Sequence, residues 1–267
     1  MTGLLIWSAS SVAMAVTSAP VPFTHGARTN YTEYSSGCGI AGSNVCSGPS
    51  NFVSNGGAWF TDSSSVNVDS SAQAYATLDA TDGTPILKAY GNAPAFGARW
   101  SGAQGVQRYQ YTGSLAATIT VTANFHSNMS GTGSGLRGSV GLFDVSAWGV
   151  ESSLEFAFDD GNVSGYLGEG LPYSSYESDS IFNATGDQNF SLTTTLDLNN
   201  GDEFFLYGAM SAYGTNGGLS DGLSTGTFSF DNNNLQILGS VSAVPVPAAL
   251  YLFSPALLGL LGLRRKS

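Results

Sequence analysis

The chain has 267 residues, of which 42% are hydrophobic, 12% aromatic and only 10% charged, and it contains 35 glycines. This composition is poor in helix formers and rich in strand and turn residues, which favours an all-β protein. Three of the eight basic residues stand at the C-terminus, so the preceding chain holds five basic against 19 acidic residues, a net charge of −14. Such a charge repels nucleic acids and anionic membranes and argues against binding to either.

The first fifteen residues combine an apolar stretch at positions 4–7 with small residues that end at Ala13, Met14 and Ala15. An apolar segment followed by an Ala-x-Ala site is typical of a secretory signal peptide, which we expect over residues 1–15. The first basic residue is Arg28, so the usual positive segment is missing, and we expect the true start codon to lie upstream. The alternative is a buried strand or helix.

Residues 16–58 are expected to form an extended lead-in with one disulfide loop. Cys38 and Cys46 stand in a segment rich in glycine and serine. In an oxidising compartment such a pair forms a local disulfide that restrains the loop. Two thiolates without neighbouring histidines supply only half of a zinc site, so a metal site is the weaker interpretation.

From about Trp59 hydrophobic and polar residues alternate, and we expect a β-sandwich domain over residues 59–243. Over residues 72–78 Ala and Leu occupy one face, and after a turn at Asp82 and Gly83 a strand over residues 84–91 completes a hairpin. The most regular strand covers residues 115–126. Its polar face carries Thr, Asn and His, and its apolar face is formed by Leu115, Ala117, Ile119, Val121, Ala123 and Phe125.

Further alternating runs cover residues 139–145, 153–158, 162–167, 189–198, 203–213, 223–230 and 235–238. One apolar and one polar face is typical of antiparallel sheets, and turns every ten to fifteen residues or so favour a sandwich or jelly roll. We therefore predict an all-β fold, an antiparallel jelly-roll-like β-sandwich followed by a single C-terminal hydrophobic helix.

Two histidines could serve a nucleophilic mechanism as a general base. His25 lies in the expected flexible lead-in, and His126 ends the regular strand beside Ser127. No Gly-x-Ser-x-Gly elbow adjoins His126 in the sequence, so the sequence favours a solvated histidine over a catalytic one at that position.

Carboxylates offer two further candidates. Glu151 and Glu155 could form the acid pair of a glycosidase, but the segment between them, Ser152 to Leu154, offers few aromatic or hydrogen-bonding groups, so a solvated face is favoured. The run from Asp159 through Asp160 and Gly161 to Asn162 could supply oxygen ligands to a structural calcium ion, although it reads mainly as a turn. We expect no other cofactor.

Aromatic side chains are the remaining indication of a ligand. Tyr109 and Tyr111 share one strand face, and Phe205, Tyr207 and Tyr213 share another. Exposed rings of this kind stack on sugars, whereas rings on an inner face are simply core, which is the favoured interpretation.

The last residues, 244–267, have three parts in a fixed order. An extended proline segment (Pro245, Val246, Pro247) precedes an uncharged apolar run over residues 248–263, and the chain closes with Arg264, Arg265 and Lys266. As a helix the apolar run would measure about 24 Å, slightly short of a bilayer core of roughly 30 Å. The basic cluster would remain cytoplasmic and leave the preceding chain outside.

This order of parts, with Val-Pro-Val-Pro at 244–247 and Leu-Leu-Gly-Leu-Leu-Gly-Leu at 257–263, resembles the PEP-CTERM sorting signal of Gram-negative bacteria. The central Glu of that family is Val246 here. The resemblance implies that an exosortase, a membrane-embedded processing enzyme, recognises the tail during export. The alternative is a plain C-terminal membrane anchor.

These features together predict an exported, non-enzymatic protein that passes through an inner-membrane-anchored intermediate to the cell surface or extracellular matrix. There it would act as a structural or adhesive component of the envelope or biofilm, with exopolysaccharide as a partner. The alternative functions are a carbohydrate-binding sandwich or, more remotely, a glycoside-acting enzyme. An exposed aromatic stripe beside a concave sheet would support binding, and two facing carboxylates in a cleft would support hydrolysis.

Overall fold

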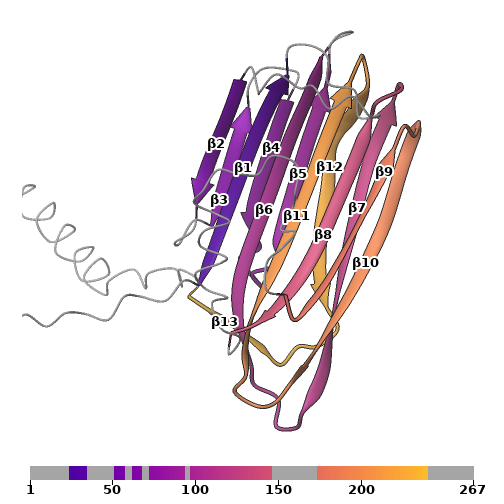
Figure 1. Cartoon of the computed structure of the whole chain (residues 1–267). Helices are drawn as coiled ribbons and strands as arrows, with labels where there is room; N and C mark the ends of the chain where they lie inside the picture. Colours follow the sequence, from indigo (N-terminus) through magenta and orange to yellow (C-terminus); the bar gives the residue numbers. More distant parts are fainter. Residues whose placement is uncertain are drawn as a thin grey trace, which may run out of the picture.

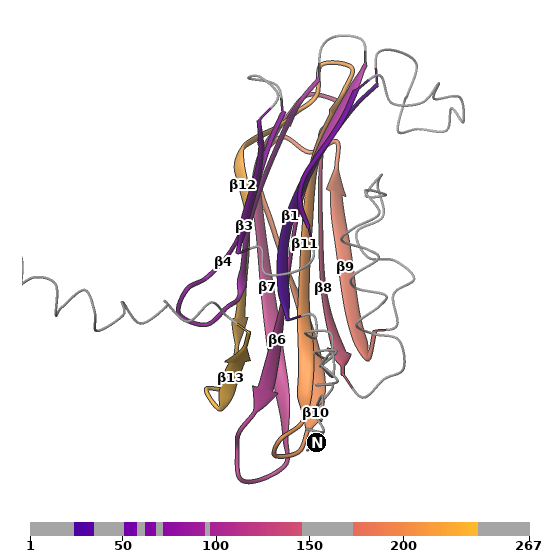
Figure 2. The same cartoon turned by 90° about the vertical axis from the view of Figure 1, so that its left-hand side faces the viewer.

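The computed structural model describes residues 24–34, 51–57, 62–67, 72–93, 97–145 and 173–239, and these residues form two antiparallel β-sheets without any helix. The sheets lie face to face, with their strands running along the length of the molecule (Figure 1). Figure 2, turned by 90°, shows the two layers edge on, with β3, β4 and β12 in one and β1, β8, β9 and β11 in the other. The predicted β-sandwich is therefore confirmed.

The larger sheet has seven strands among the described residues. Their order is β2 (Asn51–Gly57), β1 (His25–Tyr34), β6 (Ala98–Tyr111), β11 (Glu203–Thr215), β8 (Gly135–Asp144) and β9 (Ser175–Phe182), and β13 (Leu235–Leu238) pairs with the end of β6.

The smaller sheet has six strands in the same part of the chain. Their order is β10 (Gly186–Leu198), β7 (Ala117–Ser130), β12 (Leu219–Phe230), β5 (Pro85–Asn92), β4 (Ala72–Leu78) and β3 (Ser63–Asn67). Among the described strands from β5 onward, each strand lies in the opposite sheet from the one before it, except β9, which shares the larger sheet with β8. This winding gives the sandwich its jelly-roll-like character.

The core lies between the sheets and is built by alternation. On β7 the side chains of Ile119, Val121, Ala123 and Phe125 are at most 1% exposed, whereas those on the opposite face reach solvent. Two stacked sheets lie about 10 Å apart, so large rings from one sheet need small residues opposite. Gly138 on β8 meets this need, because a Cβ there would come within 2.6 Å of the Phe125 ring.

The strands predicted from alternation are present wherever the structure describes them. The hairpin of β4 and β5 has the expected turn, and the runs beginning at residues 139, 189, 203, 223 and 235 lie within β8, β10, β11, β12 and β13. The runs over residues 153–158 and 162–167 lie outside the described residues. One detail was wrong: Leu115 is 78% exposed and precedes β7, which begins at Ala117 and continues to Ser130.

The structure adds strands that alternation did not reveal. β1 and β2 lie in the segment expected to be a lead-in, yet both are paired strands of the larger sheet. β6, at the centre of that sheet, is buried on both faces with small and amide side chains such as Ala103, Gln104 and Gln107. A strand buried on both sides by such residues has no alternating hydrophobic pattern to read.

The two outer faces of the sandwich differ. On the larger sheet Phe205, Tyr207 and Tyr213 point away from the smaller sheet, yet they are at most 4% exposed. The guanidinium carbon of Arg108 lies 5.5 Å from the centre of the Phe205 ring. Arg108 also forms an ion pair with Glu203, in which Nη2 lies 2.6 Å from Oε2. The outer face of the smaller sheet, by contrast, is open to solvent along β3, β4, β7 and β10.

Candidate functional site

A groove of about 540 Å³ crosses the outer face of the smaller sheet over β3, β4 and β5. We call it the Tyr75 groove, after the aromatic side chain at its centre. The outer-face side chains that line it are Ser63, Ser65, Gln73, Tyr75, Thr77 and Lys88, with Ile86 beside them.

Strand alternation places these side chains. On β4 the side chains of Ala72, Ala74 and Ala76 are at most 1% exposed and face the core, so Gln73, Tyr75 and Thr77 must face outward. The strand register then sets Tyr75 directly between Ser65 of β3 and Lys88 of β5. Tyr75 remains 36% exposed, in contrast to the other aromatic candidates.

The groove combines an accessible aromatic ring with hydroxyl, amide and ammonium groups on both sides. A tyrosine ring offers an apolar face and a polar tip, and the Ser, Thr and Gln side chains can donate and accept hydrogen bonds. Such a surface suits a ligand that has both C–H faces and many hydroxyl groups. Among the described residues that line the groove there is neither Asp nor Glu.

A second hollow, of about 380 Å³, lies at one end of the sandwich, where Asp82 and Tyr109 face β13 and the turn before it. Two of the polar residues that line it, Asp82 and Tyr109, are hydrogen-bonded within the protein. The Asp82 carboxylate accepts hydrogen bonds from the amide and hydroxyl of Thr84, and the Tyr109 hydroxyl donates to the Asp82 carbonyl. Tyr109 is only 1% exposed, whereas Tyr75 in the first groove is 36% exposed.

The aromatic residues singled out in the sequence are buried. Tyr109 and Tyr111 lie between the sheets, and Tyr109 stacks on Phe204 with ring centres 5.4 Å apart. Phe205, Tyr207 and Tyr213 are buried on the far side of the larger sheet. Burial raises the pKa of Tyr207 well above its ordinary value, because the phenolate would lose its hydration there. The favoured interpretation, that these rings lie on an inner face, is confirmed for Tyr109 and Tyr111, whereas Phe205, Tyr207 and Tyr213 are buried on the outer face.

His126 and Ser127 point to opposite sides of β7. His126 is on the open face, 3.8 Å from the Asp187 carboxylate, with a side chain that is 55% exposed. Ser127 faces inward, is fully buried and shares a 2.9 Å hydrogen bond with Ser220. The two side chains therefore form no serine–histidine pair, and His126 is the solvated histidine that the sequence favoured.

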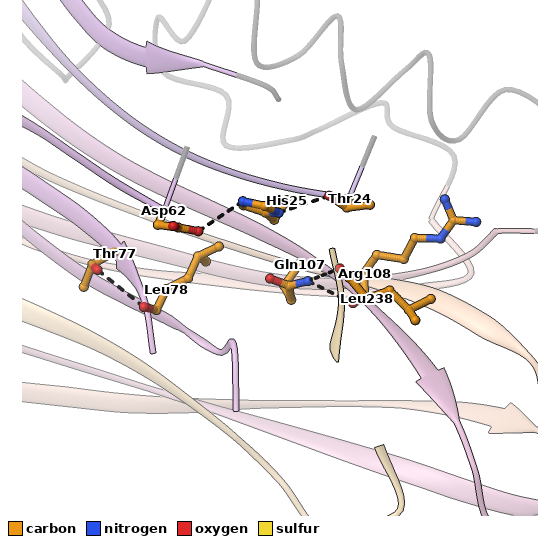
Figure 3. A network of polar contacts seen from close by, with 8 residues as sticks. All are labelled: Thr24, His25, Asp62, Thr77, Leu78, Gln107, Arg108 and Leu238. Atoms are coloured by element: carbon orange, nitrogen blue, oxygen red, sulfur yellow. Dashed lines mark hydrogen bonds and ion pairs between the residues drawn. The ribbon is translucent and has the colours of Figure 1, made fainter. Parts of the chain in front are cut away.

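His25 differs from its expected place in a flexible lead-in, because it belongs to β1 and is fully buried. Its Nδ1 lies 3.0 Å from the Thr24 hydroxyl and its Nε2 lies 3.0 Å from Asp62 Oδ1 (Figure 3). Next to the row formed by Thr24, His25 and Asp62, the side chain of Gln107 on β6 donates hydrogen bonds from Nε2 to the carbonyls of Arg108 and Leu238.

The row of hydroxyl, imidazole and carboxylate contains the residue types of a nucleophilic triad, but its burial points to another role. Thr24 is 8% exposed and His25 is not exposed at all, so a substrate has no approach to the hydroxyl. Asp62 directly precedes β3, and its carbonyl accepts a hydrogen bond from Leu78 of β4. The contact between His25 and Asp62 thus ties β1 of the larger sheet to the edge of the smaller one.

Several candidates from the sequence lie outside the described residues. These are Cys38, Cys46, Glu151, Glu155, the run from Asp159 to Asn162, and the tail with Pro245, Val246, Pro247, Arg264, Arg265 and Lys266.

Within the described ranges no three His, Cys, Asp or Glu side chains come together as metal ligands. A helix able to cross a membrane is likewise not found in the part of the chain that the structure describes.

No family model matches the sequence, and no curated protein is significantly similar to it. Among solved structures, one similar chain is TmCBM61 in complex with β-1,4-galactotriose, with 10% identity over 67% of this chain and 90% of the other, at a TM-score of 0.28. Another is the enzymatically active domain of tailspike protein 4 from bacteriophage CBA120, with 9% identity over 66% of this chain and 19% of the other, at a TM-score of 0.21. At such scores neither ligand nor activity transfers to this chain.

Stability should depend on pH through His25. Burial lowers the pKa of His25 below its ordinary value of 6.5, and the nearby Asp62 carboxylate opposes this effect only in part. Below about pH 6.5 the unfolded chain therefore binds a proton that the folded chain does not, so the free energy of unfolding falls as the pH falls.

Denaturant unfolding at pH 5, 6, 7 and 8 measures this effect. We expect the free energy of unfolding of the wild type to fall more between pH 7 and pH 5 than that of His25→Gln, which cannot be protonated. The comparison removes the contribution of the carboxylates, which both proteins share. Parallel pH profiles would contradict the account.

Proposed function

We propose that this protein is an exported carbohydrate-binding surface protein whose sandwich adheres to polysaccharide through the Tyr75 groove. The observation that carries the proposal is the 36% exposed ring of Tyr75 in a groove lined by hydroxyl and amide side chains. An aromatic ring left open to water on a sheet face loses the free energy that its burial would provide. A ligand that covers the ring recovers this free energy.

The open form of the groove favours a polymer over an enclosed small molecule. The groove spans three neighbouring strands, about 10 Å at the usual strand spacing, which is close to the length of two sugar units. A flat sugar face can cover the Tyr75 ring while its hydroxyls reach Gln73, Ser65 and Thr77. Because the described lining contains no carboxylate pair, the groove supports binding rather than glycoside hydrolysis.

Tyr75→Ala tests the groove. Loss of the ring removes the stacking surface, so we expect the dissociation constant for a bound polysaccharide to rise about ten-fold, which corresponds to about 1.4 kcal/mol. Affinity electrophoresis against a panel of soluble polysaccharides, including the host's own exopolysaccharide, gives this number. Since residue 75 is on the open face, the thermal midpoint should stay within about 3 °C.

Phe182→Ala is the matched control, because Phe182 is 46% exposed but lies on β9 of the other sheet. It should leave the affinity unchanged. Equal losses for the two variants, or none for Tyr75→Ala, would contradict the placement of the site.

We also propose that the tail over residues 244–267 delivers the sandwich to the surface as an exosortase substrate. The support for this is the order of its three parts and their resemblance to the PEP-CTERM signal. The basic cluster of Arg264, Arg265 and Lys266 would hold the end of the chain in the cytoplasm until processing.

Intact mass of the protein recovered from medium and membranes tests delivery. In a host with the sorting enzyme we expect a surface or released form that lacks everything from about Pro247 onward. In a host without the enzyme the protein should keep its full tail and stay with the membrane. A full-length, membrane-bound species in both hosts would leave a plain tail anchor.

A further inference from the structure

We propose that the Tyr75 groove selects sugars that carry a carboxylate, so that its ligand is a uronic-acid polysaccharide rather than a neutral one. This inference rests on the proposed function and adds the chemical class of the ligand. It is carried by the position of a single side chain, Lys88.

Lys88 is the only lysine before the terminal cluster, in a body with a net charge of −14. It lies on β5 in the middle of the smaller sheet, where the register sets it beside Tyr75 of β4 on one side and Thr225 of β12 on the other. Its neighbours on the core-facing side of β5, Leu87 and Ala89, are fully buried, so alternation turns Lys88 outward into the groove. Lys88 thus stands next to the exposed ring of Tyr75.

Among the described residues, the acidic side chains at the ends of β3 and β4 have partners within the protein. Asp62 precedes β3 but directs its carboxylate to His25, and the carboxylate of Asp82, in the turn between β4 and β5, accepts hydrogen bonds from Thr84. On the same sheet face Asp187 and Asp197 belong to β10, three strands from β5 and so about 14 Å away. This distance exceeds the Debye length of about 8 Å at physiological salt, so the salt screens the attraction between these aspartates and Lys88.

A sugar stacked on Tyr75 would place its ring substituents within reach of the next strand, where Lys88 stands. The lysine stem can lie along apolar surface while its ammonium group stays at the rim. A carboxylate on the sugar ring would accept a charge-assisted hydrogen bond there, whereas a neutral hydroxymethyl group would form only an ordinary one. The remainder of the acidic body repels a polyanion, so the attraction to Lys88 would have to act locally, within this groove.

The experiment measures binding of short oligomers, because long polyanions would also report the repulsion from the body. The probes are hexasaccharides of galacturonic acid and of mannuronic acid, each paired with its carboxyl-reduced counterpart, and isothermal titration calorimetry gives the dissociation constants. For the wild type we expect at least one uronate to bind about two- to five-fold more tightly than its reduced partner, as an exposed ion pair provides.

Two variants separate the charge from the ring. Lys88→Gln keeps a polar side chain but removes the charge, and it should abolish the preference while neutral binding changes less than about two-fold. Tyr75→Ala should weaken acidic and neutral oligomers alike. Thermal unfolding of each variant confirms that the sheet is intact.

The outcomes distinguish the two levels of the proposal. A wild type that binds neutral hexasaccharides as well as or better than the uronates, or a Lys88→Gln variant that keeps the preference, overturns the uronate inference and leaves carbohydrate binding in place. A wild type that binds none of the four oligomers overturns both.

Discussion

The packing of two antiparallel sheets across one narrow core is the constraint on which the rest of this structure depends. Small residues on one sheet make room for rings from the other, as Gly138 does for Phe125, and Gly208 likewise stands against the Phe228 ring. Every strand of the smaller sheet must give one face to this core. On β4 and β5 that face is taken by small and aliphatic side chains, among them Ala74 and Leu87, so Tyr75 and Lys88 face solvent. The position of the candidate groove is a direct consequence of the core packing.

The difference between the two outer faces decides where a ligand can bind. On the larger sheet the outward-facing side chains of Phe205 and Tyr207 are buried, and Arg108 is paired with Glu203. On the smaller sheet, the strands far from the groove use their polar groups among themselves, as Thr118 does with Asp197 and Asn128 with Asp187. The groove over β3 to β5 combines an exposed ring with a lysine, and these are the groups that a stacked acidic sugar would contact.

Much of the fold could be predicted from the sequence, because alternation is a local pattern and strands with one buried face display it. β7 and the hairpin of β4 and β5 are of this kind. β6 was not predicted, because both of its faces are buried with small and polar residues. β1 was not predicted either, because this polar strand is held in place by its pairing with β2 and β6. Tyr75 was visible as an outward position, but its partners Ser65 and Lys88 come from other strands, and only the register brings them together. His25 became a buried contact for the same reason, since Asp62 is distant in sequence.

Mapping the amide chemical shifts of the full chain with a uronate hexasaccharide is the most direct test of the central claim. We predict that the shifts that move on titration belong to β3, β4 and β5, with Ser65, Tyr75 and Lys88 at the centre, while those of β8, β9 and the far strand β10 stay unchanged. Perturbations that cluster on the larger sheet, or along β7 and β10 only, would contradict the account and place the binding surface elsewhere on the sandwich.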